Sequence, residues 1–364
     1  MNRKIEEILI HTLALAGILL ITGRDVKADY TFGAPTNLGP TVNSPLHEGS
    51  FWISSNELEL YFDSERPGGH GSWDIWFTSR LSKNADWDPP VNLGPNINSP
   101  HMEGGVVVSP DSLELYFAVL NKPGGYGSID IWVSTRAKKT DAWGSSVNLG
   151  PTVNSPADEV CYGISSDGLE LYFADGFIVN PRPGGQGGRD IWLTKRTTVS
   201  DPWGAPVNLE PTVNTSAVEY APFISANGLT LLLTSNGGPG SGIGDDIWIT
   251  TRSSLLGTWQ VPVPLGPPVN STSWVDAVPR LSVDNLTLYF NSDRPGSRMQ
   301  DIWQVSIKPI VDFNTDGIVD LVDLVMLIDN WETDDSVFDI GPMPWGDGVV
   351  DVEDLKVFIS HWEN

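Results

Sequence analysis

One segment near the C-terminus combines oxygen-bearing side chains at the spacing of a calcium-binding loop. Residues 312–323 read Asp-Phe-Asn-Thr-Asp-Gly-Ile-Val-Asp-Leu-Val-Asp. Side-chain oxygens stand at positions 1, 3, 5, 9 and 12, a backbone carbonyl is available at position 7, and glycine stands at position 6, where such loops turn sharply. Hard oxygen donors suit Ca²⁺, and the crowded negative charge needs a divalent cation to fold compactly. We therefore predict a Ca²⁺ cofactor with the ligands Asp312, Asn314, Asp316, Ile318, Asp320 and Asp323.

A partial copy of this loop follows further along the chain. Counted back from Gly348 at position 6, positions 1 and 3 are Met343 and Trp345 rather than acids. Asp339 lies upstream and would have to loop in to replace them. Whether a cation fills the second loop therefore stays open. Its candidate ligands are Asp347, Asp351 and Asp354.

Each loop is followed by apolar residues at helical spacing. These stripes are Leu324, Leu327, Ile328 and Trp331 after the first loop, and Leu355, Phe358, Ile359 and Trp362 after the second. The duplicated loop–helix pattern over 309–364 resembles the dockerin modules of extracellular polysaccharide-degrading systems. This resemblance implies a small α-helical, EF-hand-like module that binds calcium and docks to a cohesin-like protein partner.

The segment also departs from the family it resembles. Position 12 of the first loop is Asp323, where an EF-hand usually has Glu. The family's partner-recognition positions, which are usually small hydroxyl residues, are Leu321-Val322 and Val352-Glu353 here. The identity of a partner therefore stays open. A tail that folds around calcium without any partner is the alternative.

A second set of carboxylates recurs at intervals of 55 to 60 residues through the rest of the chain. Five converging carboxylates could hold a cation or accept hydrogen bonds from sugar hydroxyls. Alternatively, each acid caps its own repeat by binding loop amides or the arginine of a turn, as Arg66, Arg182 and Arg294 would allow. Repetition in every unit favours the cap. The acids are Glu48, Glu103, Glu159, Glu219 and Asp276.

The elements that position these acids repeat with them. Each unit offers four short strands: one after the acid, one with Leu-Tyr-Phe or a variant, one with Asp-Ile-Trp, and one with Val-Asn-Leu or a variant. Four-stranded sheets at a fixed period make a β-propeller, because neighbouring sheets bury each other's faces. The fifth unit lacks its last strand, and the surplus copy stands at 32–38. We therefore predict an all-β five-bladed β-propeller over 30–308, closed by an N-terminal strand.

The sequence of the repeat is specific for one fold. The segment 164–173, Ile-Ser-Ser-Asp-Gly-Leu-Glu-Leu-Tyr-Phe, is followed by Arg-Pro-Gly-Gly at 182–185 and Asp-Ile-Trp at 190–192. This combination resembles the WD-like β-propeller repeat family, which also includes the propeller of the bacterial Tol system. The resemblance implies the fold and leaves function open, because the family includes peptidase-associated, envelope and orphan proteins.

Ligand contacts are expected on the face that carries the long loops, such as 94–101 and 121–128. The Asp-Ile-Trp tryptophans recur inside strands and are predicted to pack between blades. The arginine six residues after four of the motif aspartates (Arg80, Arg136, Arg196 and Arg252) is predicted to pair structurally. Aromatic residues in irregular loops are better candidates for stacking on a sugar ring. These are Trp73, Tyr126 and Trp274.

The N-terminus and the charge indicate where the protein works. Residues 1–28 read as a bacterial signal peptide, with a basic start, a short apolar run and a small-residue cleavage site before Asp29, so we predict a secreted or cell-surface protein with no membrane span after cleavage. The net charge is −25, which argues against nucleic acid as a partner. Cys161 is the single cysteine, so it forms no internal disulfide and is predicted to be a buried, inert thiol.

These features favour a secreted propeller that binds a carbohydrate or protein ligand, with a calcium module for docking. Catalytic motifs such as Gly-x-Ser-x-Gly and His-Glu-x-x-His are absent from the sequence. The first alternative is a hydrolase or accessory protein that acts on O-glycosyl bonds during polysaccharide degradation, because five-bladed propellers also house glycosidases. A structural envelope protein is the second alternative.

Overall fold

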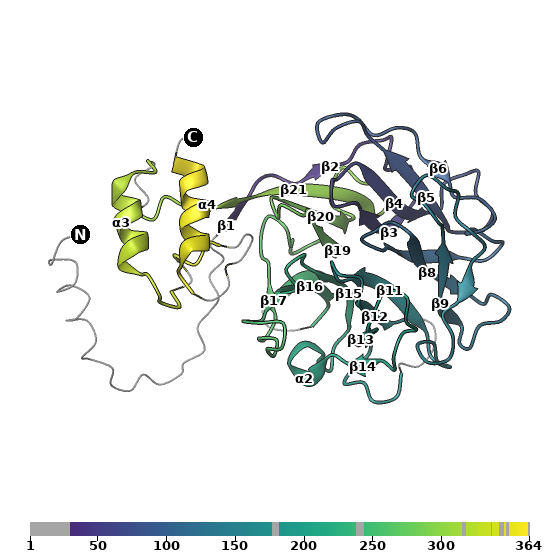
Figure 1. The fold of residues 1–364 in the computed structure, drawn as a ribbon. Coiled ribbons are helices and arrows are strands. Elements are labelled where there is room, and N and C mark those ends of the chain that lie inside the picture. Colours follow the sequence, from purple (N-terminus) through teal and green to yellow (C-terminus); the bar gives the residue numbers. More distant parts are fainter. Residues whose placement is uncertain are drawn as a thin grey trace.

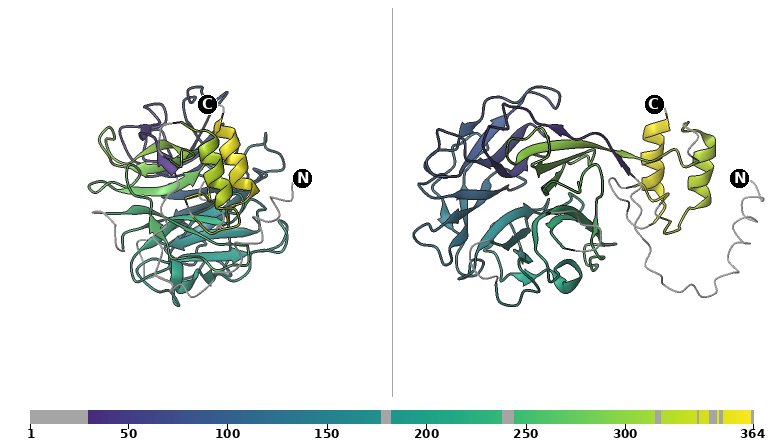
Figure 2. Two further views of the ribbon diagram at one scale, coloured as in Figure 1. Left: turned by 90° about the vertical axis from the view of Figure 1, so that its left-hand side faces the viewer. Right: turned by 180° about the vertical axis from the view of Figure 1, so that it is seen from behind.

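The computed structural model describes residues 30–176, 182–237, 244–314, 318–335, 337–341, 346 and 349–362. The predicted signal peptide lies outside these residues. Five antiparallel sheets surround a common centre, and a pair of helices lies to one side of them, as Figures 1 and 2 show. The predicted five-bladed, all-β propeller is therefore confirmed.

Each blade takes its strands in sequence order from the centre outward. Blade 1 has β3 (Glu48–Ile53), β4 (Glu59–Ser64), β5 (Asp74–Ser79) and β6 (Val91–Asn92). Blade 2 has β7 (Glu103–Val108), β8 (Glu114–Leu120), β9 (Ile129–Thr135) and β10 (Val147–Asn148). Blade 3 has β11 (Glu159–Ile164), β12 (Glu170–Asp175), β13 (Ile191–Lys195) and β14 (Val207–Asn208). Blade 4 has the short helix α2 (Glu210–Val213) before it, then β15 (Glu219–Ile224), β16 (Thr230–Ser235), β17 (Asp246–Thr251) and β18 (Val263–Pro264).

Blade 5 closes the ring with a strand from the N-terminus, as predicted. It contains β19 (Asp276–Leu281), β20 (Thr287–Ser292) and β21 (Asp301–Pro309), and its fourth strand is β2 (Thr36–Asn37). Thr36 pairs with Gln304, and Asn37 pairs with Trp303. The outermost strand of every blade has only two residues, which leaves little free sheet edge.

The repeated motif residues hold each blade together. In blade 1, the Asp74 carboxylate accepts hydrogen bonds from the backbone N–H groups of His70 and Gly71 and from the Asn92 side chain at 3.1 Å. The aspartate therefore joins the preceding loop to the outermost strand. The guanidinium of Arg80 lies 4.3 Å from the ring centre of Trp87, and the three other recurrent arginines stack in the same way. The repeated arginines and tryptophans thus serve packing.

Every innermost strand contains a β-bulge within one to three residues of its first residue. Three residues at these bulges have left-handed backbone angles: Gly105 (φ 65°), Ala221 (φ 50°) and Val278 (φ 53°). For a β-branched residue such as Val278, this conformation is strained. Bulges re-aim neighbouring side chains and cluster near functional sites. Here they line the centre of the propeller.

The last strand of the propeller leads into the C-terminal helices. Beyond its pairing with β2, β21 continues and pairs with β1 (Tyr30–Phe32), so that Tyr30 lies opposite Pro309. Helices α3 (Leu321–Asp329) and α4 (Val352–Trp362) follow, in the regions where the apolar stripes predict helices. Their core includes Leu327, Ile340 and Phe358, and the Tyr30 hydroxyl donates to the Ile340 carbonyl at 3.1 Å. In the part of the chain that the structure describes, no helix has the length and apolar character needed to cross a membrane.

A candidate ligand site in the central channel

A cavity of about 250 Å³ lies in the centre of the propeller. All five innermost strands contribute to its wall, each through residues near the start of the strand, close to the bulges. These residues are Gly49, Ser50, Gly104, Gly105, Val160, Tyr162, Tyr220, Ala277 and Val278. The innermost strands start on the face that carries the long loops, so the cavity belongs to the face on which ligand contacts were expected.

One carboxyl group stands in the wall of this cavity. Asp63, near the end of β4, is only 3% exposed. Its Oδ2 accepts hydrogen bonds from the Ser50 hydroxyl and from the backbone N–H of Gly105 at 3.1 Å. Its Oδ1 is buried and has no hydrogen-bond partner among the described residues. Burial outweighs these hydrogen bonds and raises the pKa of Asp63 to about 7.

The space around Asp63 depends on a glycine. A Cβ atom on Gly49 would lie 1.9 Å from Asp63 Oδ1 and 2.6 Å from the Trp73 ring. Any other residue at this position would push the carboxyl or the indole away. Glycine therefore allows the acid and the aromatic ring to stand side by side in the wall.

A second residue with a buried acceptor oxygen lines the same cavity from blade 5. Asn291 on β20 is 1% exposed, and its amide nitrogen donates to the Glu48 carbonyl at 2.9 Å. Its Oδ1 has no hydrogen-bond partner in the described part of the chain. Leaving a buried polar atom unpaired costs about 1–3 kcal/mol. Asp63 and Asn291 thus line the same cavity, and each has one buried acceptor oxygen without a hydrogen-bond partner among the described residues.

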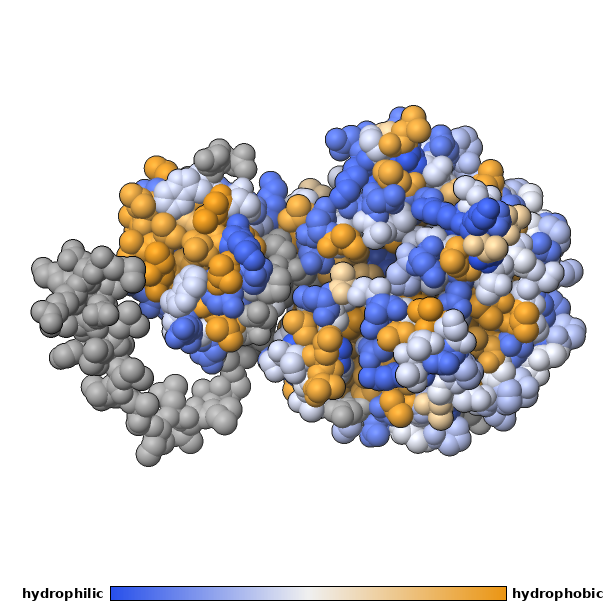
Figure 3. Space-filling model, viewed as in Figure 1, coloured by the Kyte–Doolittle hydropathy of each residue, from blue (hydrophilic) through white to orange (hydrophobic). Residues whose placement is uncertain are grey.

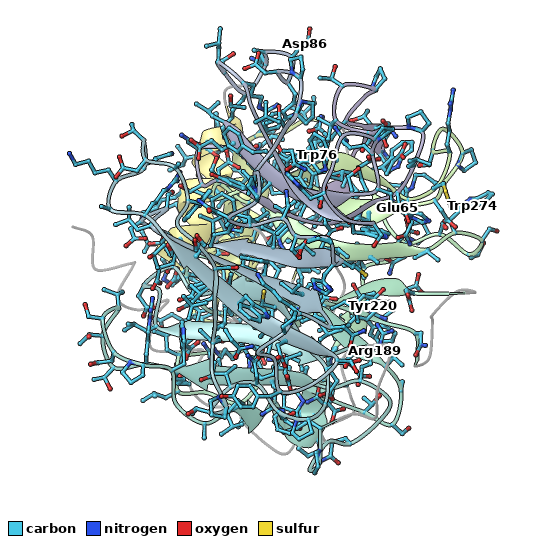
Figure 4. All side chains as sticks on the ribbon, turned by 90° about the vertical axis from the view of Figure 1, so that its right-hand side faces the viewer. Glu65, Trp76, Asp86, Arg189, Tyr220 and Trp274 are labelled. Carbon is cyan, nitrogen blue, oxygen red and sulfur yellow. The ribbon has the colours of Figure 1, made fainter. Side chains whose placement is uncertain are left out.

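Aromatic rings and a cation complete the wall. The rings of Tyr162 and Tyr220 meet edge to face, with centres 6.2 Å apart. The Arg189 guanidinium lies 5.3 Å from the ring centre of Tyr220, whose hydroxyl donates to Asp245 at 2.8 Å. Figure 4 shows Tyr220 and Arg189 close together on the same side of the propeller as the loop residue Trp274.

Arg280 fills the channel beyond the cavity. This residue of β19 is 1% exposed. Its guanidinium donates to the carbonyl of Pro279 at 2.7 Å and to the carbonyl of Tyr162 in blade 3. It also lies within 6.0 Å of the ring centres of Phe51 and Phe223. Within the described residues no carboxylate forms an ion pair with it, and burial lowers its pKa to about 10.

The five repeated acids lie near the cavity but do not line it. Each is at most 1% exposed and accepts a hydrogen bond from a serine or threonine four or five residues earlier. Glu48, Glu159 and Asp276 also pair with Arg66, Arg182 and Arg294. Burial raises the pKa of Glu103 and of Glu159 to about 7. This geometry favours the capping interpretation.

Replacing Glu159 with alanine is expected to lower stability without changing ligand affinity. The Arg182 guanidinium would lose its buried acceptor at 2.8 Å, and such a loss costs about 3–5 kcal/mol. Urea unfolding and calorimetry of the variant measure the two effects separately. The exposed Asp141→Ala serves as control. A fall in affinity at unchanged stability would assign the repeated acids to ligand binding.

The raised pKa values predict the pH dependence of folding. Asp63, Glu103 and Glu159 hold their protons to about pH 7 in the folded protein. In the unfolded chain such groups lose them near pH 4. The folded state therefore binds more protons between these limits, and stability falls as pH rises from about 5 to 8. Calorimetry at fixed calcium concentration should show a lower melting temperature at pH 8 than at pH 5. The difference should be smaller in Asp63→Asn. A melting temperature that is higher at pH 8 than at pH 5 would contradict the prediction.

Of the aromatic residues predicted to contact a ligand, one lies in this cavity. Trp73 contributes to the wall and packs on His47 with ring centres 5.7 Å apart. Tyr126 and Trp274 lie outside the wall on loops, 49% and 39% exposed. Cys161 is fully buried, and burial raises the pKa of its thiol, as expected for an inert cysteine.

Comparisons with known proteins find similarity in fold only. Neither a family model nor a curated protein matches the chain. A putative TolB from Agrobacterium tumefaciens is 14% identical, with 71% of this chain and 76% of that chain covered and a TM-score of 0.43. An endo-arabinanase from Bacillus licheniformis is 12% identical, covering 73% and 94%, with a TM-score of 0.46. An α-L-arabinofuranosidase from Podospora anserina is 12% identical, covering 78% and 98%, with a TM-score of 0.45. All these scores are below 0.5, so the functional argument depends on this chain's own residues.

Sequence reasoning missed the residues that distinguish this channel. Asp63 and Asn291 directly follow the Leu-Tyr-Phe motifs of blades 1 and 5, where blades 2 and 3 have alanine. Arg280 pairs with the motif tyrosine of its blade, and the residues in the same register of the other blades are Trp52, Val107, Gly163 and Phe223. A blade-by-blade comparison of register positions would have found all three. The sequence signal in each case is a residue that differs from those at the same position of the other blades.

The C-terminal loops carry a second set of buried acids. Asp323 is fully buried and accepts hydrogen bonds from the backbone N–H groups of Phe313 at 2.7 Å, Asn314 at 3.2 Å and Asp320 at 2.9 Å. Its carboxylate therefore ties the start of the first loop to its end. The predicted ligands Asp316 and Asp347 lie outside the described residues. Among the described residues, no group of three or more His, Cys, Asp or Glu side chains converges on a metal-sized point.

The second loop repeats this arrangement with a different starting residue. Asp354 is fully buried and accepts from the N–H groups of Gly341 and Asp351, both at 2.6 Å. Gly341 follows Asp339 by two residues, as Asn314 follows Asp312. Asp339 therefore lies two residues before an amide that Asp354 binds, as Asp312 does in relation to Asp323.

Proposed function

We propose that this chain is a secreted or cell-surface protein whose propeller binds a carbohydrate in the central channel. The observation that carries the proposal is the pair of buried acceptor oxygens, Asp63 Oδ1 and Asn291 Oδ1, in the wall of one cavity. Sugar hydroxyls are donors that can satisfy both.

The rest of the wall suits a sugar as well. Aromatic rings bind the C–H faces of sugars while their polar edges stay hydrogen-bonded. Trp73, Tyr162 and Tyr220 supply such rings, and Arg189 adds hydrogen-bond donors. A cavity that is mostly apolar with a few placed polar groups is typical of small-molecule sites.

Binding is favoured over hydrolysis by the number of carboxyl groups. Glycoside hydrolysis generally uses two, one as acid and one as base or nucleophile. Among the described residues of the cavity wall, Asp63 is the one carboxyl. The hydrolase alternative would need a second acid beside the ligand.

The test is a glycan array probed with the full chain in the presence of calcium. The proposal expects binding to a restricted set of glycans, without release of reducing sugar. Release of reducing sugar that depends on Asp63 would replace it with the hydrolase alternative. No binding to any glycan would favour the structural envelope protein.

We propose further that the C-terminal segment is a dockerin-like module that binds Ca²⁺ and docks to a cohesin-like protein. The ligands would be Asp312, Asn314, Asp316, the Ile318 carbonyl, Asp320 and Asp323 in the first loop, and Asp339, Asp347, Asp351 and Asp354 in the second. The equivalent amide contacts of Asp323 and Asp354 support two related loops. The bound cation would neutralise the clustered acids and fix the two helices.

The outer face of α3 is the proposed docking surface. Leu321, Val325 and Ile328 recur at helical spacing and are 65%, 53% and 51% exposed. Figure 3 shows apolar side chains gathered on this module. A pull-down from cell-surface extract with the full chain, with and without chelator, tests the proposal. Recovery of the same proteins under both conditions would rule out calcium-dependent docking.

A further inference from the structure

The central channel is a blind pocket. Its wall comes from residues near the start of each innermost strand, on the long-loop face. Beyond it stand residues that solvent does not reach: Phe51 and Cys161 have no exposed surface, and Arg280 is 1% exposed. A ligand can therefore enter from the long-loop face but cannot pass through the propeller.

Arg280 is the residue that closes the channel. It extends from blade 5 to the Tyr162 carbonyl of blade 3, and its guanidinium contacts the rings of Phe51 in blade 1 and Phe223 in blade 4. Four of the five blades therefore hold one side chain at the centre. In the same register, blade 3 has Gly163, which lets the Pro222 carbonyl approach closely, since a Cβ at this position would lie 2.8 Å from that oxygen. The channel is therefore closed because different blades have different residues at the register position of Arg280.

The pocket is also small. At about 250 Å³ it lies below the roughly 300–1,000 Å³ of cavities that take drug-sized ligands. That volume suits a single sugar ring. A residue inside a glycan chain has a neighbour on each side, and both neighbours would need an exit. A terminal residue needs one exit only.

From these observations we propose that the channel recognises the terminal residue of a glycan chain and excludes internal residues. This inference rests on the proposed carbohydrate function and narrows it to chain ends. The terminal ring inserts toward Asp63 and Asn291, where its free hydroxyls donate to the two acceptor oxygens. The rest of the chain leaves through the mouth, past the loops.

Ligand length tests the proposal with the full chain. From the linear polysaccharide that gives the strongest array signal, a trimer, a hexamer and the parent polymer are compared by calorimetry, with concentration expressed per chain. We expect the same Kd for the trimer and the hexamer, and no more than two protein copies on each polymer chain. Many copies along one polymer, or affinity that rises in proportion to length, would overturn the inference.

The control separates this inference from the function it rests on. Asp63→Asn removes one of the two acceptors in the channel and should weaken binding of every ligand in the series roughly 10- to 100-fold. Binding along the polymer that needs Asp63 means that the channel binds glycan but not by its ends, and only the present inference fails. Absence of any Asp63-dependent binding overturns both the inference and the proposed carbohydrate site in the channel.

Discussion

Asp63→Asn is expected to weaken carbohydrate binding roughly 10- to 100-fold, because a hydrogen bond to a charged group contributes about 1.5–3 kcal/mol. The amide would keep its oxygen toward the Gly105 N–H, which is 3.1 Å from Oδ2. Its NH₂ group would then face the cavity, where Oδ1 now stands unpaired. The variant replaces an acceptor with a donor and keeps the shape of the side chain. Calorimetry at pH 8, above the pKa of about 7, measures the effect on the carboxylate form.

The matched control is Asp86→Asn, which removes one exposed carboxylate outside the channel. It should leave affinity unchanged. Asn291→Ala should give a smaller loss than Asp63→Asn, because a neutral acceptor contributes less than a charged one. Equal affinity in Asp63→Asn and the unaltered protein, at equal melting temperature, would place the binding site elsewhere.

Removal of calcium is expected to unfold the C-terminal helices and leave the propeller intact. In the absence of the cation, the acids of each loop repel one another around a buried aspartate. Asp323→Ala should have the same effect on the first loop, because it removes a proposed ligand together with three backbone hydrogen bonds. We expect at least a hundredfold weaker calcium affinity at that loop, about 2.7 kcal/mol.

Backbone amide resonances of α3 and α4 report this unfolding directly, and calcium titration gives the affinity. Asp329→Ala, an exposed acid at the end of α3, is the control and should titrate like the unaltered chain. If chelator leaves the helix resonances in place, or if Asp323→Ala binds calcium normally, the proposed loops are not calcium sites.

The propeller architecture could be predicted from the sequence because each repeated unit contains the residues that form one blade. The Asp-Ile-Trp motif places an aspartate where it joins a loop to the outermost strand, and in four of the five blades a basic side chain lies over its tryptophan. The fifth unit lacks its fourth strand, and a surplus copy of that strand stands near the N-terminus. The sequence therefore predicts that the N-terminal copy completes the fifth blade, and β2 does pair with β21. Helices α3 and α4 follow from apolar residues at helical spacing.

The channel chemistry does not follow in the same way. Asp63, Asn291 and Arg280 are exceptions to the repeat, and their meaning depends on which positions face the axis. That geometry is set by bulges in the innermost strands, such as the one after Ala277, which a repeat pattern does not reveal.

The length of β21 determines how a tethered propeller would bear force. This strand forms six residue pairs with β20 and continues past them to pair with β1 before the chain enters the helices. A pull on the helices acts along the strand, so its hydrogen bonds are loaded together in shear and not opened one after another. Flow or traction on an anchored molecule would therefore strain the ring at its best-paired strand, while the short outermost strands would carry little of the load.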